Sequence, residues 1–136
     1  MRVIIIRTSV SAAFALLGCA LVVHASTLVQ NGDDVVRGKE VYNQCIGCHS
    51  PERHRTGPKH CGLIGRNAGA AEGYEYSSAM RESGIVWSTQ TLDYFLYSPL
   101  EYMPGINMGI AGIKDENDRM DLIAYLIAMN ERSECE

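Results

Sequence analysis

Basic residues and long apolar runs are scarce in this sequence, and it shows no convincing strand pattern and no internal repeat. Its 136 residues include 12 Lys and Arg against 16 Asp and Glu, so the formal net charge at pH 7 is −4. Nucleic acids and anionic membrane surfaces bind proteins through clustered positive charge, and an acidic chain suits neither. No feature indicates a hydrolase. The length predicts a single domain.

The one sustained apolar stretch lies at the N-terminus and has the layout of a secretory signal peptide. Arg2 and Arg7 make its start basic, residues 8–23 are almost entirely small or apolar, and Ala25 ends a small-residue cleavage site. The run is too short to predict a membrane span. We expect residues 1–25 to be a signal peptide, 26–32 a flexible arm and 33–136 the folded domain. Cleavage would remove two basic and no acidic residues, which changes the net charge to −6.

A second processing site overlaps this stretch. Leu16-Leu17-Gly18-Cys19 resembles a bacterial lipoprotein box, and cleavage before Cys19 would leave an acylated cysteine and a tethered protein. A single acyl chain anchors only marginally, so we favour the signal peptide. Either route exports the chain, and we expect it in a bacterial periplasm, with a lipid-anchored form as the alternative.

Two cysteines and a histidine form the most informative motif, Cys45-Ile46-Gly47-Cys48-His49. Cys-x-x-Cys-His is the attachment pattern for c-type haem. Each thiol can bond a vinyl group of the porphyrin, and the imidazole of His49 can ligate the iron. A zinc site would need two further ligands at similar spacing, and a thioredoxin-like redox pair would need a preceding strand. Neither context is visible, so we predict one covalently attached haem c.

Capping residues and apolar spacing predict four helices. Asp33 and Asp34 can cap a first helix that runs into Cys45. A short helix is expected over residues 77–83, and Ser88 caps a third that ends before Pro99. The inward face of the first helix comprises Val35, Gly38, Val41 and Tyr42. Glycine inside a helix costs about 1 kcal/mol relative to alanine, so we expect Gly38 to permit a close helix crossing.

The fourth helix is expected at the C-terminal end, where acidic residues open it from Asp115 onward. Its inward residues are expected to be Met120, Leu122, Ile123, Leu126 and Ile127. Residues 50–73 and 99–112 carry many glycines and prolines, and we expect both segments to be irregular.

A haem that carries electrons needs a second axial ligand, and methionine sulfur raises its reduction potential. Met80, Met120 and Met129 lie in helical patterns typical of core residues. Met103 and Met108 lie in the predicted loop, which can place a sulfur atom over the iron. Spacing alone does not choose between these two.

Together these motifs resemble the class I cytochromes c, close to the mitochondrial and bacterial c2 types, over about residues 33–131. The matching runs are Cys45-Ile46-Gly47-Cys48-His49, Thr56-Gly57-Pro58, Gly65-Arg66, Gly73-Tyr74-Glu75-Tyr76, Val86-Trp87, Tyr102-Met103-Pro104-Gly105-Ile106-Asn107-Met108 and Arg119-Met120-Asp121-Leu122-Ile123-Ala124-Tyr125-Leu126. The resemblance implies an all-α fold with helices wrapped around one covalently attached haem. It also implies that Gly38 and Tyr42 pack against the last helix near Leu122 and Tyr125.

The resemblance further implies roles for single residues. Met108 corresponds to the methionine that ligates the iron, and Met103 becomes a packing residue. The carbonyl of Pro58 accepts a hydrogen bond from the free ring N–H of His49, which fixes the ligand's orientation. The residues implied to hold a buried haem propionate are Arg66, Tyr76 and Trp87.

The chain departs from the mitochondrial type in two ways. Three positions near the methionine that are polar in that type are apolar here, namely Met80, Phe95 and Ile106. They cannot support an internal water, so we expect a drier methionine side. The usual lysines at the haem edge are missing, and the positions flanking the ligand loop are Leu100, Glu101 and Asn107. We therefore expect docking through an apolar patch or onto a basic partner, and lysine-poor cytochromes of methylotrophic bacteria look similar.

Two cysteines remain after haem attachment, Cys61 and Cys135. An even pair left over in an exported protein favours a disulfide, although unrelated thiols stay an alternative because connectivity is not readable from sequence. His54 and His60 are expected to be surface or loop histidines. His60 is the less usual of the two, since the matching position in the family is usually apolar.

The pattern as a whole predicts an exported, monomeric one-electron carrier with a low-spin haem ligated by His49 and Met108. It would pass electrons from an upstream cytochrome or dehydrogenase to an oxidase, without enzymatic activity of its own. One alternative is a haem subunit or tethered module of a larger dehydrogenase or oxidase complex. Another is a peroxidase or ligand binder, which would need an open sixth position on the iron.

Overall fold

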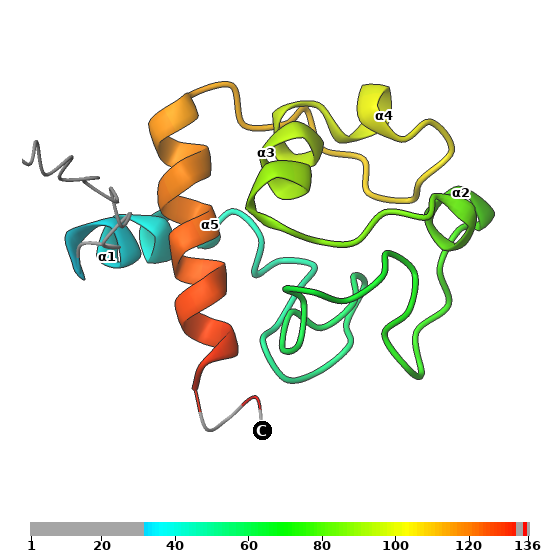
Figure 1. Ribbon diagram of the computed structural model, residues 1–136, viewed down its shortest axis with the longest axis horizontal. Coiled ribbons are helices and arrows are strands. Elements are labelled where there is room, and N and C mark those ends of the chain that lie inside the picture. Colours follow the sequence, from blue (N-terminus) through cyan, green and yellow to red (C-terminus); the bar gives the residue numbers. More distant parts are fainter. Residues whose placement is uncertain (1–31, 133–134, 136) are drawn as a thin grey trace, which may run out of the picture.

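The computed structural model describes residues 32–132 and residue 135, and within that range the chain forms five helices and no β-strand (Figure 1). The helices are α1 (Gly32–Tyr42), α2 (Ser78–Glu82), α3 (Thr89–Tyr97), α4 (Pro99–Tyr102) and α5 (Glu116–Asn130). An isolated antiparallel bridge pairs Asn67 with Val86. The predicted all-α class is confirmed. The expected signal peptide, and the expected arm up to residue 31, lie outside the described residues.

Three of the helices begin where a side chain caps the first turn. The Ser77 hydroxyl accepts a hydrogen bond from the N–H of Met80 and starts α2. Ser88 and Thr91 form a reciprocal capping box at the start of α3. The Asp115 carboxylate accepts from the N–H of Asp118 and starts α5. Each cap satisfies backbone donors that have no partner inside the helix, so the predicted starts of these three helices are confirmed.

Two predicted boundaries are wrong. The first helix does not run into Cys45 but ends at Tyr42, after which the N–H of Cys45 bonds the Tyr42 carbonyl at 2.8 Å in a turn. The segment 99–112 is not irregular throughout, because its first four residues form α4. Pro99 stands at the start of that helix, where its fixed φ and missing N–H are favourable.

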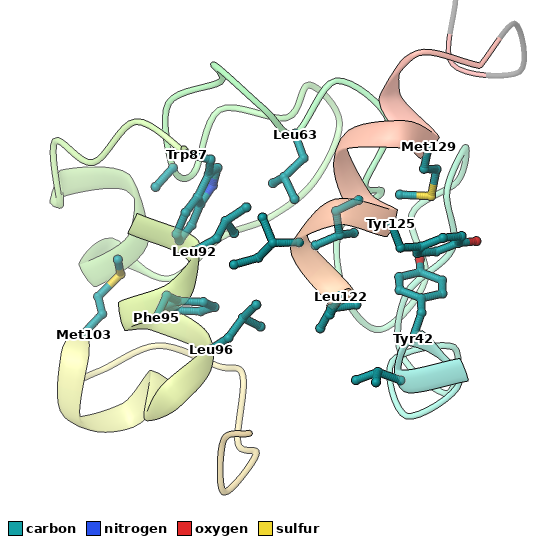
Figure 2. Packing of buried hydrophobic residues seen from close by; sticks show 14 of the residues in the cluster. Tyr42, Leu63, Trp87, Leu92, Phe95, Leu96, Met103, Leu122, Tyr125 and Met129 are labelled. Atoms are coloured by element: carbon teal, nitrogen blue, oxygen red, sulfur yellow. The ribbon is translucent and has the colours of Figure 1, made fainter. Parts of the chain in front are cut away.

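Helices α1 and α5 cross in close contact (Figure 1). A Cβ atom on Gly38 would lie 1.9 Å from the carbonyl oxygen of Asp121, so only glycine permits this approach. The rings of Tyr42 and Tyr125 pack with centroids 5.1 Å apart, and Figure 2 shows them together. The predicted close crossing at Gly38 is therefore confirmed.

Helix α5 is covered on more than one side. Leu122, Ile123 and Met129 are each 1% exposed, whereas Met120 is 37% exposed, so its expected place in the core is wrong. Its neighbours are buried instead, because Arg119 pairs with Asp93 at 2.6 Å and Asp121 pairs with Arg37 at 2.7 Å. These ion pairs connect α5 to partners on α3 and α1.

Trp87, Phe95 and Met103 gather on the α3 side of the core, apart from Tyr42, Tyr125 and Met129 on the α5 side (Figure 2).

The segment between α1 and α2 has no helix, and backbone hydrogen bonds fix it in place. Gly65 donates to the Trp87 carbonyl at 2.8 Å, and Trp87 donates to the Arg66 carbonyl at 3.0 Å. Among the described helices, none is both long and apolar enough to span a membrane.

Candidate functional site

A cavity of about 440 Å³ lies between the helices and the helix-free segment. Its lining is mainly apolar and includes Leu92, Phe95, Leu96 and Leu122. All eight residues that the sequence singled out contribute to it, namely Cys45, Cys48, His49, Pro58, Arg66, Tyr76, Trp87 and Met108. Binding sites for small molecules and cofactors typically have this size and this apolar lining with a few polar groups.

The imidazole of His49 is 8% exposed and is held mainly by backbone groups. Its Nδ1 lies 2.7 Å from the Pro58 carbonyl oxygen, so Nδ1–H donates and Nε2 is left as the nitrogen available to a metal. A Cβ on Gly57 would lie 2.4 Å from Cε1 of this ring, so the glycine is required for the close approach. Burial lowers the pKa of His49, and the Pro58 hydrogen bond partly opposes that effect. The ring is therefore kept neutral, as metal ligation requires.

His60 is a contact that the sequence did not predict. It lies in a loop, as expected, but its ring faces inward and stacks on His49 with centroids 4.2 Å apart and planes 21° apart. Its Nδ1 is 3.0 Å from the hydroxyl of the buried Tyr42. Burial, with smaller effects from His49 and Arg66, lowers the pKa of His60 to about 3. The only signal in the sequence was a polar residue where the family usually has an apolar one.

The two motif cysteines do not have the environment of a redox-active pair. Burial, and to a smaller extent Cys48, raises the pKa of the Cys45 thiol to about 11. Reactive thiols have lowered pKa values, because the thiolate is the reacting form. A helix, α1, precedes the motif in place of the strand typical of thioredoxin-like proteins. Both findings favour structural attachment of a cofactor over dithiol chemistry.

Arg66 supplies the clearest sign of a missing anionic group. Its Nη1 donates to the Cys61 carbonyl at 2.9 Å and its Nη2 to the Lys59 carbonyl at 3.2 Å. Within the described residues, its Nε is the buried side-chain nitrogen that lacks a partner. Burial lowers the pKa of Arg66, and leaving a buried donor unpaired is costly. A carboxylate in the cavity would satisfy this N–H.

Tyr76 and Trp87 line the cavity together with Arg66. Burial raises the pKa of Tyr76, so its hydroxyl stays a neutral donor. Trp87 is 6% exposed and packs edge-on against Phe95 at 5.0 Å between centroids. The three residues thus offer N–H and O–H donors to one cavity, which suits a group with carboxylates on an apolar body.

The two candidate methionines have different places. Met108 is half-buried and lines the cavity, whereas Met103 is 5% exposed and belongs to the core cluster. Of the three apolar replacements, Met80 and Phe95 line the cavity, and Ile106 is buried near them. Two of the three apolar replacements thus line the cavity, and the drier methionine side stays a prediction.

The structure joins Cys61 and Cys135 as a disulfide, with Cα atoms 5.0 Å apart and a sequence separation of 74. Cys61 follows His60 directly, so the link connects the chain beyond α5 to the loop that packs on His49. That the mature protein holds this bond oxidised stays a prediction.

The residues present fit a haem. The thiols of Cys45 and Cys48 and the neutral imidazole of His49 adjoin the cavity, and the thioether of Met108 lines it. The buried Nε–H of Arg66 has no partner within the described residues and can bond an anion. A porphyrin has an apolar ring for the apolar lining and propionates for the donors. A Cys-x-x-Cys-His motif in such a helical fold defines a c-type haem protein.

Comparisons with known proteins agree. A family model described as cytochrome c matches residues 35–130. Cytochrome c of Euglena viridis is 43% identical over 96 residues, covering 68% of this chain and 94% of that protein. Cytochrome c2 of Rhodomicrobium vannielii is 38% identical over 115 residues, covering 82% and 90%. The solved structure of cytochrome cH from Methylobacterium extorquens has a TM-score of 0.69 and 35% identity, covering 70% of this chain and 98% of that one.

The chain belongs to the cytochrome c family and is a class I c-type cytochrome. It binds one iron-containing haem c covalently and is an electron-transfer protein, not an enzyme. The predicted resemblance, cofactor and class of function are confirmed. The similarity to a methylotroph's cytochrome also agrees with the narrower resemblance drawn from the missing lysines.

Proposed function

We propose that this protein is an exported one-electron carrier whose low-spin haem is ligated by His49 and Met108. The observation that carries the proposal is that one cavity receives the imidazole of His49, with Nδ1 already engaged, and the side chain of Met108. Two axial ligands leave no open position on the iron for a substrate, so electrons can move while small molecules are excluded.

The bound haem supplies the Fe(II)/Fe(III) couple, and the protein supplies its surroundings. The Pro58 carbonyl orients His49 and makes its Nε2 a better donor to the metal. Cys45 and Cys48 attach the porphyrin. The apolar side chains of Met80, Phe95 and Leu96 exclude water from the methionine side.

Arg66, Tyr76 and Trp87 are proposed to hold a propionate inside the cavity. An unpaired carboxylate would be costly to bury, and the free Nε–H of Arg66 together with the neighbouring O–H and N–H groups offsets that cost. The charge of the ferric iron and that of the propionate then lie within one low-dielectric volume.

Spectroscopy of the haem-loaded protein tests the ligation. The ferric form is expected to show the near-red absorption band of a sulfur–iron bond and to keep it when cyanide is added. Reductive titration is expected to follow a single one-electron step. A five-coordinate spectrum that shifts at once with cyanide would favour a ligand binder or peroxidase, and co-purification with a large subunit would favour a module of a complex.

Export is proposed from the N-terminal segment and from the Cys61–Cys135 pair, which suits an oxidising compartment. Mass measurement of the protein recovered from a bacterial periplasm is expected to give a chain that starts at Ser26 and carries no lipid. A lipid-modified chain that starts at Cys19 would support the lipoprotein route instead.

The redox partner is proposed to be basic or to present an apolar face. The chain's three lysines all lie in the described range, and none lines the cavity. Ile46, next to Cys45, is 47% exposed, and Ile110, in the cavity lining, is 41% exposed. Electron-transfer rates with a basic partner should fall as salt is added, because screening weakens the steering field. A rate that rises with salt would favour an acidic partner.

A further inference from the structure

His60 packs directly on the proposed axial ligand, and no motif role accounts for it. Its ring lies parallel to within 21° of the His49 ring at a centroid distance of 4.2 Å. An aliphatic side chain at this position would fill the same space, but it would present no planar face. The stacked geometry therefore offers a means of setting the plane of the His49 imidazole.

The His60 ring is itself held firmly. The hydroxyl of Tyr42 lies 3.0 Å from its Nδ1. The backbone N–H of His60 donates to the carbonyls of Ser50 at 3.2 Å and of Pro51 at 3.1 Å. The next residue, Cys61, donates to Pro51 at 2.8 Å and carries the link to Cys135. Both ends of the side chain are thus anchored.

Tyr42 connects this ring to the crossing of α1 and α5. The tyrosine is 3% exposed, and burial raises the pKa of its hydroxyl, which therefore stays neutral and shares a hydrogen bond with Nδ1 of His60. The Tyr42 ring meets His60 edge-on at 5.6 Å and packs on Tyr125 at 5.1 Å. Contacts therefore run from α5 through α1 and His60 to His49.

The hydrogen bond to Pro58 alone does not fix the plane of the His49 ring, and Gly57 offers the ring no side chain to pack on. A hydrogen bond such as that to Pro58 tolerates tens of degrees of misalignment before it weakens steeply. A neighbour packed on the face of the ring resists tilting, because any tilt brings ring atoms into overlap.

We propose that His60, anchored by Tyr42, is a positioning residue that sets the plane of the axial imidazole and thereby the electronic structure of the haem iron. The proposal rests on the proposed ligation by His49. The His60 ring lines the cavity beside His49, and it is proposed to act on the iron through that imidazole.

The test uses haem-loaded ferric protein and compares wild type with His60→Leu, Tyr42→Phe and the double variant. Proton NMR of the haem methyl groups reports the orientation of the axial imidazole, and the reduction potential is measured in parallel. His60→Leu is expected to change the spread and order of the methyl shifts. Tyr42→Phe should change them less and in the same direction, and the double variant should match His60→Leu alone.

Two further variants separate positioning from stability. His60→Phe keeps a planar face against His49 and should move the methyl shifts back toward the wild-type pattern. His54→Leu removes the other histidine of the same loop, whose Nε2 bonds the Glu72 carbonyl at 2.8 Å and whose ring packs on Tyr74. It should leave the methyl shifts and the potential unchanged, even where it lowers the unfolding midpoint.

Unchanged methyl shifts and potential in His60→Leu, with wild type showing methionine ligation, would overturn the positioning role and leave the proposed ligation intact. Equal effects of Tyr42→Phe in the wild-type and His60→Leu backgrounds would show that Tyr42 does not act through His60, and would also overturn it. A wild-type spectrum without histidine and methionine ligation would overturn both proposals. If His60→Leu takes up no haem, Tyr42→Phe and His60→Phe decide the question.

Discussion

Backbone groups hold His49, one proposed iron ligand, on its side of the cavity, whereas a loop and apolar packing hold Met108, the other proposed ligand. The Pro58 carbonyl accepts a hydrogen bond from one ring nitrogen of His49, and the backbone at Gly57 approaches the ring too closely to leave room for a side chain. Met108 lies instead in the loop after α4, which turns at Gly105 with φ of +91° and rejoins the fold where Ile113 donates to the Leu96 carbonyl at 2.8 Å. Bonded contacts resist rearrangement more than a loop anchored at its ends does. Ligand exchange is therefore expected on the methionine side.

The largest effect is expected from Gly57→Ala on the His49 side. The added methyl group would lie 2.4–2.7 Å from three atoms of the His49 ring, and it cannot be accommodated without moving the ligand or the backbone. We expect almost no correctly ligated protein, measured by haem absorbance and the near-red band. The matched control is Gly109→Ala beside Met108, where no protein atom lies within 4 Å of the added methyl group. Equal yields of the two variants would contradict the difference between the two sides.

Removal of the disulfide tests how much the stability of the His49 side depends on the covalent link between Cys61 and Cys135. Replacing Cys61 and Cys135 with serine should lower the free energy of unfolding by about 2–5 kcal/mol, because the open chain gains freedom when it unfolds. The methionine band should persist in native buffer, since Met108 lies in another loop. Guanidinium unfolding with and without reductant measures the loss, and reductant should not affect the double variant. Two thiols that alkylate freely in the unreduced wild type would show that the bond does not form.

Alkaline pH probes the methionine side. Displacement of sulfur by an amine needs a lysine within reach, and residues 99–112 contain none. Lys114 is engaged elsewhere, with its Nζ 2.7 Å from the Tyr97 carbonyl oxygen and 4.0 Å from the centre of the Tyr97 ring. We expect ferric protein to keep methionine ligation up to pH values near the ordinary lysine pKa of about 10.4, and to form no amine-ligated species.

Magnetic resonance of the ferric haem across a pH series measures this directly. Asn107→Lys supplies the amine that the loop lacks, because residue 107 is exposed and next to Met108. This variant should form an amine-ligated species at lower pH than wild type. A lysine-ligated species in wild type at mildly alkaline pH would show that the loop opens further than its anchors suggest.

The sequence predicted best what depends on local chemistry. The starts of α2, α3 and α5 follow from Ser77, Ser88 and Asp115, because a cap acts within three residues of itself. The haem-attachment motif is local in the same sense, since its two cysteines and its histidine lie within five consecutive residues. The close crossing at Gly38 was also predictable, because an interior glycine in a helix requires a packing reason.

Features that depend on distant partners were missed. Met120 faces outward while its neighbours Arg119 and Asp121 are buried in ion pairs, whose partners lie 26 and 84 residues away. The stack of His60 on His49 depends likewise on Tyr42, in α1. Residue type and periodicity carry no information about such pairs.

The most direct test of the central claim, ligation by His49 and Met108, compares Met108→Ala with Met103→Ala. Met108 lines the cavity, so its loss should abolish the near-red band and let cyanide or water bind the ferric iron. Met103 is buried in the core, so Met103→Ala should keep the band and lower the free energy of unfolding by about 2–5 kcal/mol. Loss of the band in Met103→Ala and its survival in Met108→Ala would contradict the proposed ligand set.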